Sequence, residues 1–445
     1  MKSHSSRLGE TPVLKLIMQM STPSVVSMMV IAAYNMVDAI FVGHFVGPDG
    51  LAALASNIPA VILLMGFSLF IGVGGSAAIS RSLGMEKQDQ ANHILGVMIF
   101  LVLVLGAVSL LIAATRVQWI LLLVGTSEGL LLPASQYLSI LLLGGPLSIF
   151  SIAMNNTVRA EGNARMAMVS MVTGALVNVG LDPLFIHTFD WGIKGAAWAT
   201  VVSNLVTTCI MLWYLHSGRS SLILKLSCIR FHYGVFKEIA GVGMSTLLMN
   251  SSATVIQSLV LRTLIQYGGD TAVSVYAMCN RTMMFLFMPV FGIQAGVTPI
   301  IGYNFGAKLM KRVRQTIFTS IGLCTLYLGV GWIFLQSFPE VFIGAFTDSP
   351  ELLEVGVDSI KKLSVAFFVV GIPIMIVGTF QAIGKAKYAL FLTTNRTVIL
   401  IIPLLLFLPT RIGLDGVWYA FPISDCLATL VNVIFFWRVF KQFRD

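Results

Sequence analysis

Long apolar stretches, separated by short breaks rich in glycine, proline and charge, run through the whole chain. None of them alternates polar and apolar residues as a membrane β-strand does. Each is long enough to cross the roughly 30 Å hydrocarbon core of a bilayer as a helix. The pattern therefore predicts an all-α integral membrane protein with twelve spanning helices, at residues 14–46, 50–80, 91–115, 130–158, 166–188, 193–216, 236–266, 271–303, 315–337, 355–382, 388–408 and 415–438.

Short motifs recur at an almost constant spacing. GNARMA at 162–167 matches GKAKYA at 384–389, 222 residues later, and GIKGAAWA at 192–199 matches GLDGVWYA at 413–420, 221 residues later. Six helices separate the copies. Because six is an even number, both halves begin on the same side of the membrane, so they are parallel repeats. We expect an N-lobe at 1–217, a cytoplasmic linker at 218–235 and a C-lobe at 236–445. Transporters built from repeats bind their substrate near the midplane, between the halves.

Charge is scarce and unevenly placed. Only 11% of the 445 residues are charged, against about 25% in soluble domains. Most Lys and Arg residues fall in alternate connections, which predicts that both termini are cytoplasmic. This placement explains the net charge of +9 without a nucleic-acid partner. The five scattered cysteines indicate neither disulfides nor a zinc site.

A few polar side chains fall within the apolar stretches of the N-lobe. Asp38 lies on the first helix, Asn178 and Asp182 lie one turn apart on the fifth, and Thr200 lies on the sixth. A carboxylate at membrane depth is costly and is usually functional. The four side chains offer oxygen ligands, which suit Na⁺, and protonation of the acids is an equal alternative. A purely structural hydrogen-bonded cluster is the third interpretation.

Proline divides the first helix. At 33 residues, this stretch would be about 50 Å long as one helix, so it must tilt, extend past the membrane or bend. Pro23 is the expected hinge, because proline removes a backbone hydrogen bond.

The C-lobe lacks these acids. Val260 and Leu404 occupy the positions equivalent to Asp38 and Asp182. On its membrane helices this lobe instead carries Arg281, Arg396 and Asp425, and we expect the last two to form a structural or gating ion pair.

Other side chains could line a soft cavity of the kind that promiscuous binders use, although a membrane Met more often packs or faces lipid. These candidates are Met29, Tyr34, Asn35, Met36, Met65, Asn156, Met249, Gln257 and Met284.

Five ordered motifs carry a family resemblance. AAYNMVDAIFVGHFVG after Pro23, RAEGNARMAM at 159–168, NVGLDPLFI at 178–186, WGIKGAAWAT at 191–200 and PIIGYNFGAK at 299–308 together resemble the multidrug and toxic compound extrusion (MATE) family. The branch looks like that of the DNA-damage-inducible protein F-like and related bacterial multidrug exporters.

The resemblance implies a V-shaped pair of six-helix lobes in the bacterial cytoplasmic membrane, working as a monomer among lipids without a cofactor. It implies export of drugs, mainly amphipathic organic cations, in exchange for H⁺ or Na⁺. The family's coupling acid matches Asp38, its other ion-site residues match Asn178, Asp182 and Thr200, and its helix-1 proline matches Pro23. Other branches carry acids on helices 7 and 10, which this chain lacks at membrane depth.

Two other functional classes can be compared with a drug exporter. A lipid-linked precursor flippase has the same two-lobe layout, but it should line its cavity with several cations, and only Arg281 and Arg396 lie well inside the C-lobe. An enzyme is not expected, because the chain has no HExxH motif or glycine-rich phosphate loop.

Overall fold

The first half of the chain folds into a bundle of membrane-spanning helices. The computed structural model describes residues 5–441 and contains only helices and connecting segments in that range. The elements of the first half are α1 (Arg7–Glu10), α2 (Val13–Phe45), α3 (Pro48–Gly84), α4 (Gln88–Thr115), α5 (Val117–Val124), α6 (Glu128–Leu143), α7 (Gly145–Ala160), α8 (Ala164–Pro183), the π-helix η1 (Leu184–Thr188) and α9 (Ile193–His216).

The second half repeats this arrangement. It contains the 3₁₀-helix η2 (Leu226–Cys228), α10 (Tyr233–Gly306), α11 (Met310–Ser337), α12 (Pro339–Gly344), α13 (Pro350–Leu363), the 3₁₀-helix η3 (Phe367–Val369), α14 (Gly371–Ala382), α15 (Ala386–Thr394), the π-helix η4 (Asn395–Leu400), α16 (Ile401–Ile412) and α17 (Asp415–Phe440). Helix α10 is divided into two arms at Gly269, whose φ of 63° and ψ of −159° lie outside the helical region. Glycine adopts this conformation readily because it has no Cβ.

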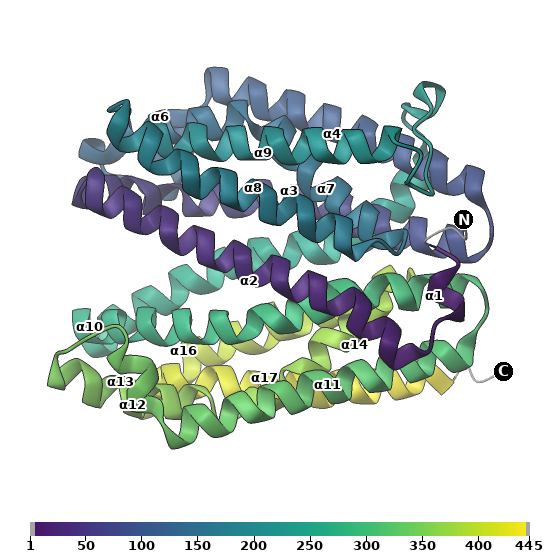
Figure 1. Cartoon of the computed structure of the whole chain (residues 1–445). Helices are drawn as coiled ribbons and strands as arrows, with labels where there is room; N and C mark the ends of the chain where they lie inside the picture. Colours follow the sequence, from purple (N-terminus) through teal and green to yellow (C-terminus); the bar gives the residue numbers. More distant parts are fainter. Residues whose placement is uncertain (1–4, 442–445) are drawn as a thin grey trace.

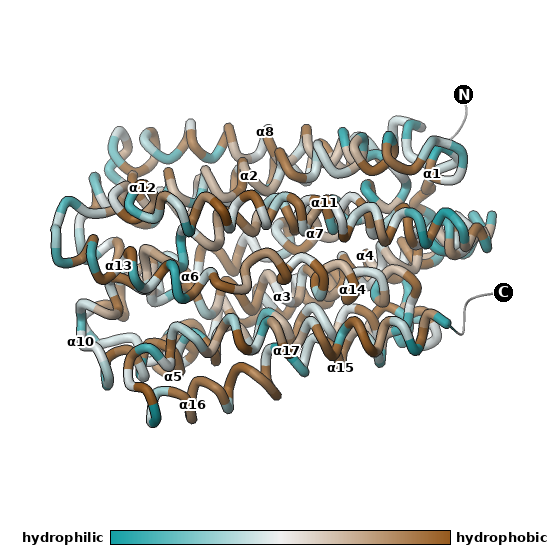
Figure 2. Tube along the Cα trace, turned by 90° about the horizontal axis from the view of Figure 1, so that it is seen from below, coloured by the Kyte–Doolittle hydropathy of each residue, from teal (hydrophilic) through white to brown (hydrophobic). Residues whose placement is uncertain are grey.

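The described residues account for twelve membrane spans. Nine helices are long and apolar enough to cross a bilayer, and two bent pairs of helices add two more spans. The break in α10 supplies the twelfth. Figure 2 shows hydrophobic residues along the length of the helices and hydrophilic ones gathered near their ends. The predicted twelve-helix fold is confirmed, with α9 starting and ending at the predicted residues.

Two of the spans that the sequence predicted as single helices are bent. Between α6 and α7 the chain bends by 54° within the predicted span 130–158, and between α13 and α14 it bends by 43° within the predicted span 355–382. The first bend falls at Gly144 and Gly145, which precede Pro146. Glycine and proline favour a break there, but the apolar pattern alone gives only the length of a span.

Two bundles with separate hydrophobic cores make up the molecule, and they diverge from one end to form a V (Figure 1). The two chain termini lie at the end where the bundles meet, which we call the terminal end. Buried residues such as Met98 and Leu138 belong to the cores of the first bundle, and Cys324 and Trp418 belong to the core of the second. The exact lobe and linker boundaries stay a prediction.

Helix α2 bridges the bundles. It packs on α8 of the first half and on α10 of the second. Its first turns join the core of the second bundle, with Leu16 and Ile17 buried there. The Arg312 guanidinium donates to the carbonyl oxygen of Thr11 at 2.6 Å, just before α2 begins. The helix therefore starts fixed to the second bundle and ends beside the first.

Candidate functional site

The centre of the candidate site is the contact between α2 and α8. Asp38 is half-buried on α2, and the side chains of Asn178 and Asp182 on α8 are 1% and 0% exposed. Within residues 5–441, both carboxylate oxygens of Asp182, Oδ1 of Asp38 and both polar atoms of the Asn178 amide are buried without a hydrogen-bond partner. Buried polar groups normally have partners, so this concentration of unsatisfied oxygens is suited to binding a cation.

The two carboxylates are close enough to interact electrostatically with each other. Both also lie near the phenol groups of Tyr34 on α2 and Tyr137 on α6. The structure therefore brings Asp38, Asp182 and Tyr34 together, as one cluster with Tyr137. Sequence reasoning missed Tyr137, although a tyrosine within the apolar run 130–158 was the available signal.

The end of α8 shapes the backbone beside Asp182. Pro183 has no N–H to donate to the carbonyl of Val179, one turn earlier. The chain continues from Pro183 as the π-helix η1, and such segments occur often at functional sites. The sequence LDP thus places the acid where the regular α-helical hydrogen bonding ends.

Thr200 and Pro23 are less directly connected to the cluster. The Thr200 hydroxyl donates to the carbonyl of Ala196 at 3.1 Å, within its own helix α9, so its role as a ligand stays a prediction. Pro23 is buried inside α2, which is helical throughout, and the Ser27 hydroxyl donates to its carbonyl at 2.9 Å. Helix α2 therefore continues without a break through the predicted hinge in this conformation.

The predicted cavity residues occupy helices of both lobes. Met29, Tyr34 and Asn156 are half-buried, and the Asn156 amide donates to the carbonyl of Ile152 at 2.9 Å. The exposed members are Asn35 and Met36 on α2, Met65 on α3, and Met249, Gln257 and Met284 on α10. Their role in substrate binding stays a prediction.

The equivalent positions of the C-lobe are apolar. Val260 is fully buried, and Leu404 packs against the core of the second bundle. Arg396 lies in the π-helix η4, and its Nε donates to Asp425 Oδ1 at 2.7 Å. The predicted pair therefore forms, while Arg281 is exposed on α10.

Comparison with known proteins identifies the family. The MatE family model matches residues 23–184 and 242–406, which contain the α2–α8 cluster and its counterpart in the second half. The chain belongs to the MatE family. This MatE protein is similar to the multidrug export protein MepA of Staphylococcus aureus (strain MRSA252), with 26% identity over 427 residues, covering 96% of this chain and 94% of MepA.

Solved structures show the same fold. The MatE chain is similar to the MATE multidrug transporter DinF-BH, which was solved as a complex, with a TM-score of 0.92, 36% sequence identity and 98% of each chain covered. It is also similar to the outward-facing conformation of a multidrug resistance MATE family transporter, with a TM-score of 0.93, 25% identity and 98% of each chain covered.

Proposed function

We propose that this protein is a multidrug efflux antiporter that exports amphipathic organic cations and related compounds in exchange for H⁺ or Na⁺. Family membership and the names of its relatives, a multidrug export protein and a multidrug transporter, support the transport class. The coupling residues are Asp38 and Asp182, with Asn178 and Thr200 completing the ion site.

The observation that carries this proposal is the unpartnered acid pair between α2 and α8. Five buried polar atoms of Asp38, Asn178 and Asp182 lack hydrogen bonds within the described part of the chain. A purely structural cluster would satisfy these atoms, because unsatisfied buried polar groups reduce stability. A transporter needs them available to bind an ion.

Neutralisation of the acids supplies the coupling. A buried charge costs several kcal/mol, and H⁺ or Na⁺ arriving from outside removes that cost. Helix α2 can then bend at Pro23 and repack against α8, which narrows the N-lobe side of the pathway and expels the drug. Because the ion and a cationic drug compete for the same carboxylates, binding of one weakens binding of the other.

Charge distribution supports an orientation. The helices alternate in direction, so the connections 85–87, 161–163, 217–232, 307–309 and 383–385 lie on the same side as the termini. Counted with the two termini and the adjoining helix ends, this side carries 20 of the 28 Lys and Arg residues, and basic segments stay in the cytoplasm. We therefore assign the terminal end to the cytoplasm of a bacterium and the diverging end of the lobes to the outside.

The flippase alternative is not favoured. A lipid pyrophosphate would need several free cations in the second half, but Arg396 is already neutralised by Asp425. Of the two arginines considered for binding a pyrophosphate, Arg281 is then the one left.

Transport by purified protein in liposomes tests the proposal. We expect ethidium, a fluorescent organic cation, to move when either a Na⁺ gradient or a pH gradient is imposed. The gradient that drives this movement identifies the coupling ion. Asp38→Asn and Asp182→Asn should each abolish the gradient-driven movement, because they remove the exchangeable charge while keeping the side-chain shape.

Asp190→Asn is the matched control, because Asp190 is an exposed acid in the left-handed conformation that asparagine tolerates. This variant should transport ethidium like the parent. Parent-level transport by both Asp38→Asn and Asp182→Asn would rule out the coupling role.

A further inference from the structure

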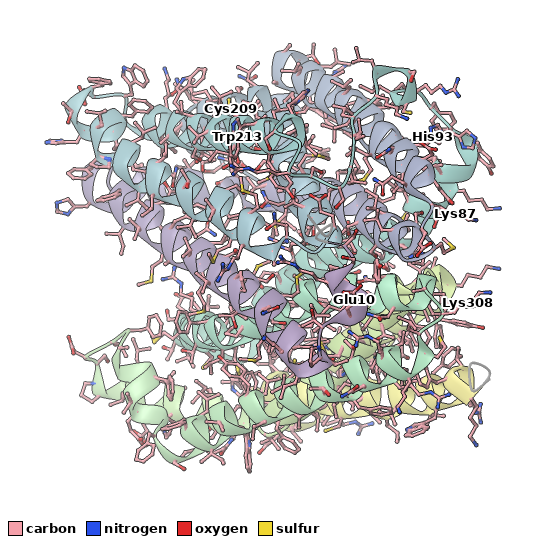
Figure 3. The ribbon with its side chains drawn as sticks, turned by 45° about the vertical axis from the view of Figure 1, so that its right-hand side comes forward. Glu10, Lys87, His93, Cys209, Trp213 and Lys308 are labelled. Carbon is pink, nitrogen blue, oxygen red and sulfur yellow. The ribbon has the colours of Figure 1, made fainter. Side chains whose placement is uncertain are left out.

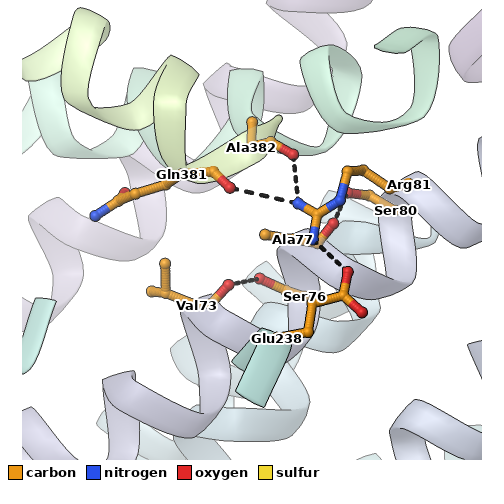
Figure 4. A network of polar contacts seen from close by, with 8 residues as sticks. All are labelled: Val73, Ser76, Ala77, Ser80, Arg81, Glu238, Gln381 and Ala382. Atoms are coloured by element: carbon orange, nitrogen blue, oxygen red, sulfur yellow. Dashed lines mark hydrogen bonds and ion pairs between the residues drawn. The ribbon is translucent and has the colours of Figure 1, made fainter. Parts of the chain in front are cut away.

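One arginine of the N-lobe reaches across to two helices of the C-lobe at the terminal end. Arg81 lies in the last turn of α3, and its side chain is 9% exposed. Its Nη1 donates to the carbonyl oxygen of Ala382 at 2.7 Å and more weakly to that of Gln381 at 3.5 Å, while Nη2 contacts Glu238 Oε1 at 2.7 Å. Figure 4 shows the guanidinium between these partners on α14 and α10.

The C-terminal end of α14 is well suited to bind the Arg81 guanidinium. The last carbonyls of a helix lack intrahelical partners and carry partial negative charge. Helix α14 ends at Ala382, and the chain turns away at Gly384, which has a φ of +76°. A Cβ at Gly384 would lie 2.9 Å from the Arg81 guanidinium carbon, so only glycine suits both the turn and the docked arginine.

The close backbone contact between α3 and α10 near Arg81 occurs at equivalent positions in both halves, but the arginine side chain is present in the first half alone. A Cβ on Gly84 would overlap the Tyr303 carbonyl, and a Cβ on Gly306 would overlap the Arg81 carbonyl. Gly84 and Gly306 are 222 residues apart, as are Arg81 and Tyr303. Each repeat therefore contributes one glycine to the close approach of α3 and α10. At the position equivalent to Arg81, the second repeat has Tyr303.

We propose that Arg81 is the positioning residue that locks the two lobes together at the terminal end, and that it must release Ala382 and Glu238 when this end opens. The inference rests on the proposed transport function, because a transporter that opens alternately to each side has to break this contact in every cycle. A single buried side chain that holds two C-lobe helices by charge-assisted hydrogen bonds provides a strong but reversible closure.

Distances between spin labels test the lock without measuring transport. Lys87 and Lys308 are exposed in the turns after α3 and α10, at the terminal end of opposite lobes (Figure 3). Lys87→Cys and Lys308→Cys would carry the labels, in a background where the cysteines that are not buried are changed to serine, namely Cys209, Cys228 and Cys426. The parent should show one short distance.

Removing the lock should shift the balance toward opening. We expect Arg81→Gln to add a longer-distance component and to raise the ratio of open to closed molecules about ten-fold or more. Glu238→Gln should produce a smaller rise, because it leaves the Ala382 contact. Arg81→Lys should recover part of the closed population, since lysine restores the charge without the forked geometry.

Lys225→Ala is the matched control. It removes an exposed ion pair with Asp89, with side chains 49% and 94% exposed, that does not join the lobes, and its distances should equal the parent's. Parent-like distances in folded Arg81→Gln and Glu238→Gln would overturn the proposal. If Arg81→Gln does not fold, Glu238→Gln decides alone, because its side chain is 37% exposed and nearly isosteric with glutamine.

The outcomes separate the lock from the coupling mechanism. Intact ethidium transport by Asp38→Asn and Asp182→Asn together with a longer distance in Arg81→Gln would reject the coupling and keep the lock. The reverse pair of results would reject the lock and keep the coupling.

Discussion

Carboxylates away from the surface of this chain have three kinds of surroundings, and these predict their roles. Asp425 is paired with the Arg396 guanidinium, so its charge is balanced within the C-lobe. Asp182 is fully buried beside a second acid and has no hydrogen-bonded partner among residues 5–441. Glu161 is also fully buried and its Oε1 has no hydrogen-bond partner among the described residues, but its Oε2 accepts hydrogen bonds from neutral groups. Of these, Asp182 has surroundings that leave its charge for an exchangeable ion.

Glu161 connects the N-lobe to the interlobe linker outside the membrane spans. Its Oε2 accepts from the Ser220 hydroxyl at 2.9 Å and from the Ser221 N–H at 2.6 Å. Burial raises the pKa of this carboxyl from 4.5 to about 7, outweighing the hydrogen bonds that favour the charged form. The native state therefore holds the proton more firmly than the unfolded state.

This shift predicts a pH-dependent stability. The contribution of Glu161 is complete below about pH 4.5 and is lost as the pH rises through about 7. The loss should be about 3 kcal/mol across that range. Thermal unfolding in detergent should therefore give a smaller decrease in stability from pH 5 to pH 8 for Glu161→Gln than for the parent.

Glu128→Gln removes an exposed acid at the start of α6 and should keep the parent's pH dependence. An unchanged slope in Glu161→Gln would show that other groups cause the pH dependence.

At the scale of the helices, apolar periodicity predicted the number and length of the spans. It could not predict their bends, because the direction of a chain after a break depends on what it packs against. The sequence identified Asp38, Asn178 and Asp182, since a carboxylate in an apolar run is conspicuous. It gave no special role to Arg81, because an arginine near a helix end is ordinary until the opposite lobe is placed beside it.

The close contact of α3 with α10 predicts the effect of a single methyl group. Gly84→Ala would place a Cβ against the Tyr303 carbonyl, where backbone has to move. We expect the variant to lose about 1–3 kcal/mol of stability, measured as a lower unfolding temperature than the parent's.

Gly129→Ala is the comparison, because a Cβ at this position in α6 meets no atom within 4 Å. It should be neutral or slightly stabilising, since alanine favours a helix. Equal unfolding temperatures for Gly84→Ala and Gly129→Ala would contradict the close packing at the terminal end.

At the scale of the whole molecule, α2 belongs to both bundles. Its first turns are buried in the core of the second bundle, and its later turns pack on α8 of the first. A change at Asp38 can therefore act on the opposite lobe through one helix. The internal repeat predicted two halves, but it did not predict that the first helix would be shared, because that depends on contacts between distant segments.

The assigned orientation predicts which end of the molecule a reagent outside the cell can reach. In the background lacking exposed cysteines, Glu128→Cys at the start of α6 should react with a membrane-impermeant maleimide in intact cells. Lys87→Cys, at the terminal end, should react only after permeabilisation. Basic connections remain in the cytoplasm during insertion, which is the physical reason for this difference. The opposite pattern would reverse the assignment.

The confinement of the acid pair to one lobe has an energetic consequence. Two carboxylates can take up at most two elementary charges in each cycle. If both are filled by monovalent ions while one monovalent drug leaves, one net positive charge enters the cell. Each such charge gains about 2.3 kcal/mol for every 100 mV of membrane potential. The voltage of the cell would then drive export even where the concentrations of the exchanged ion are equal on the two sides.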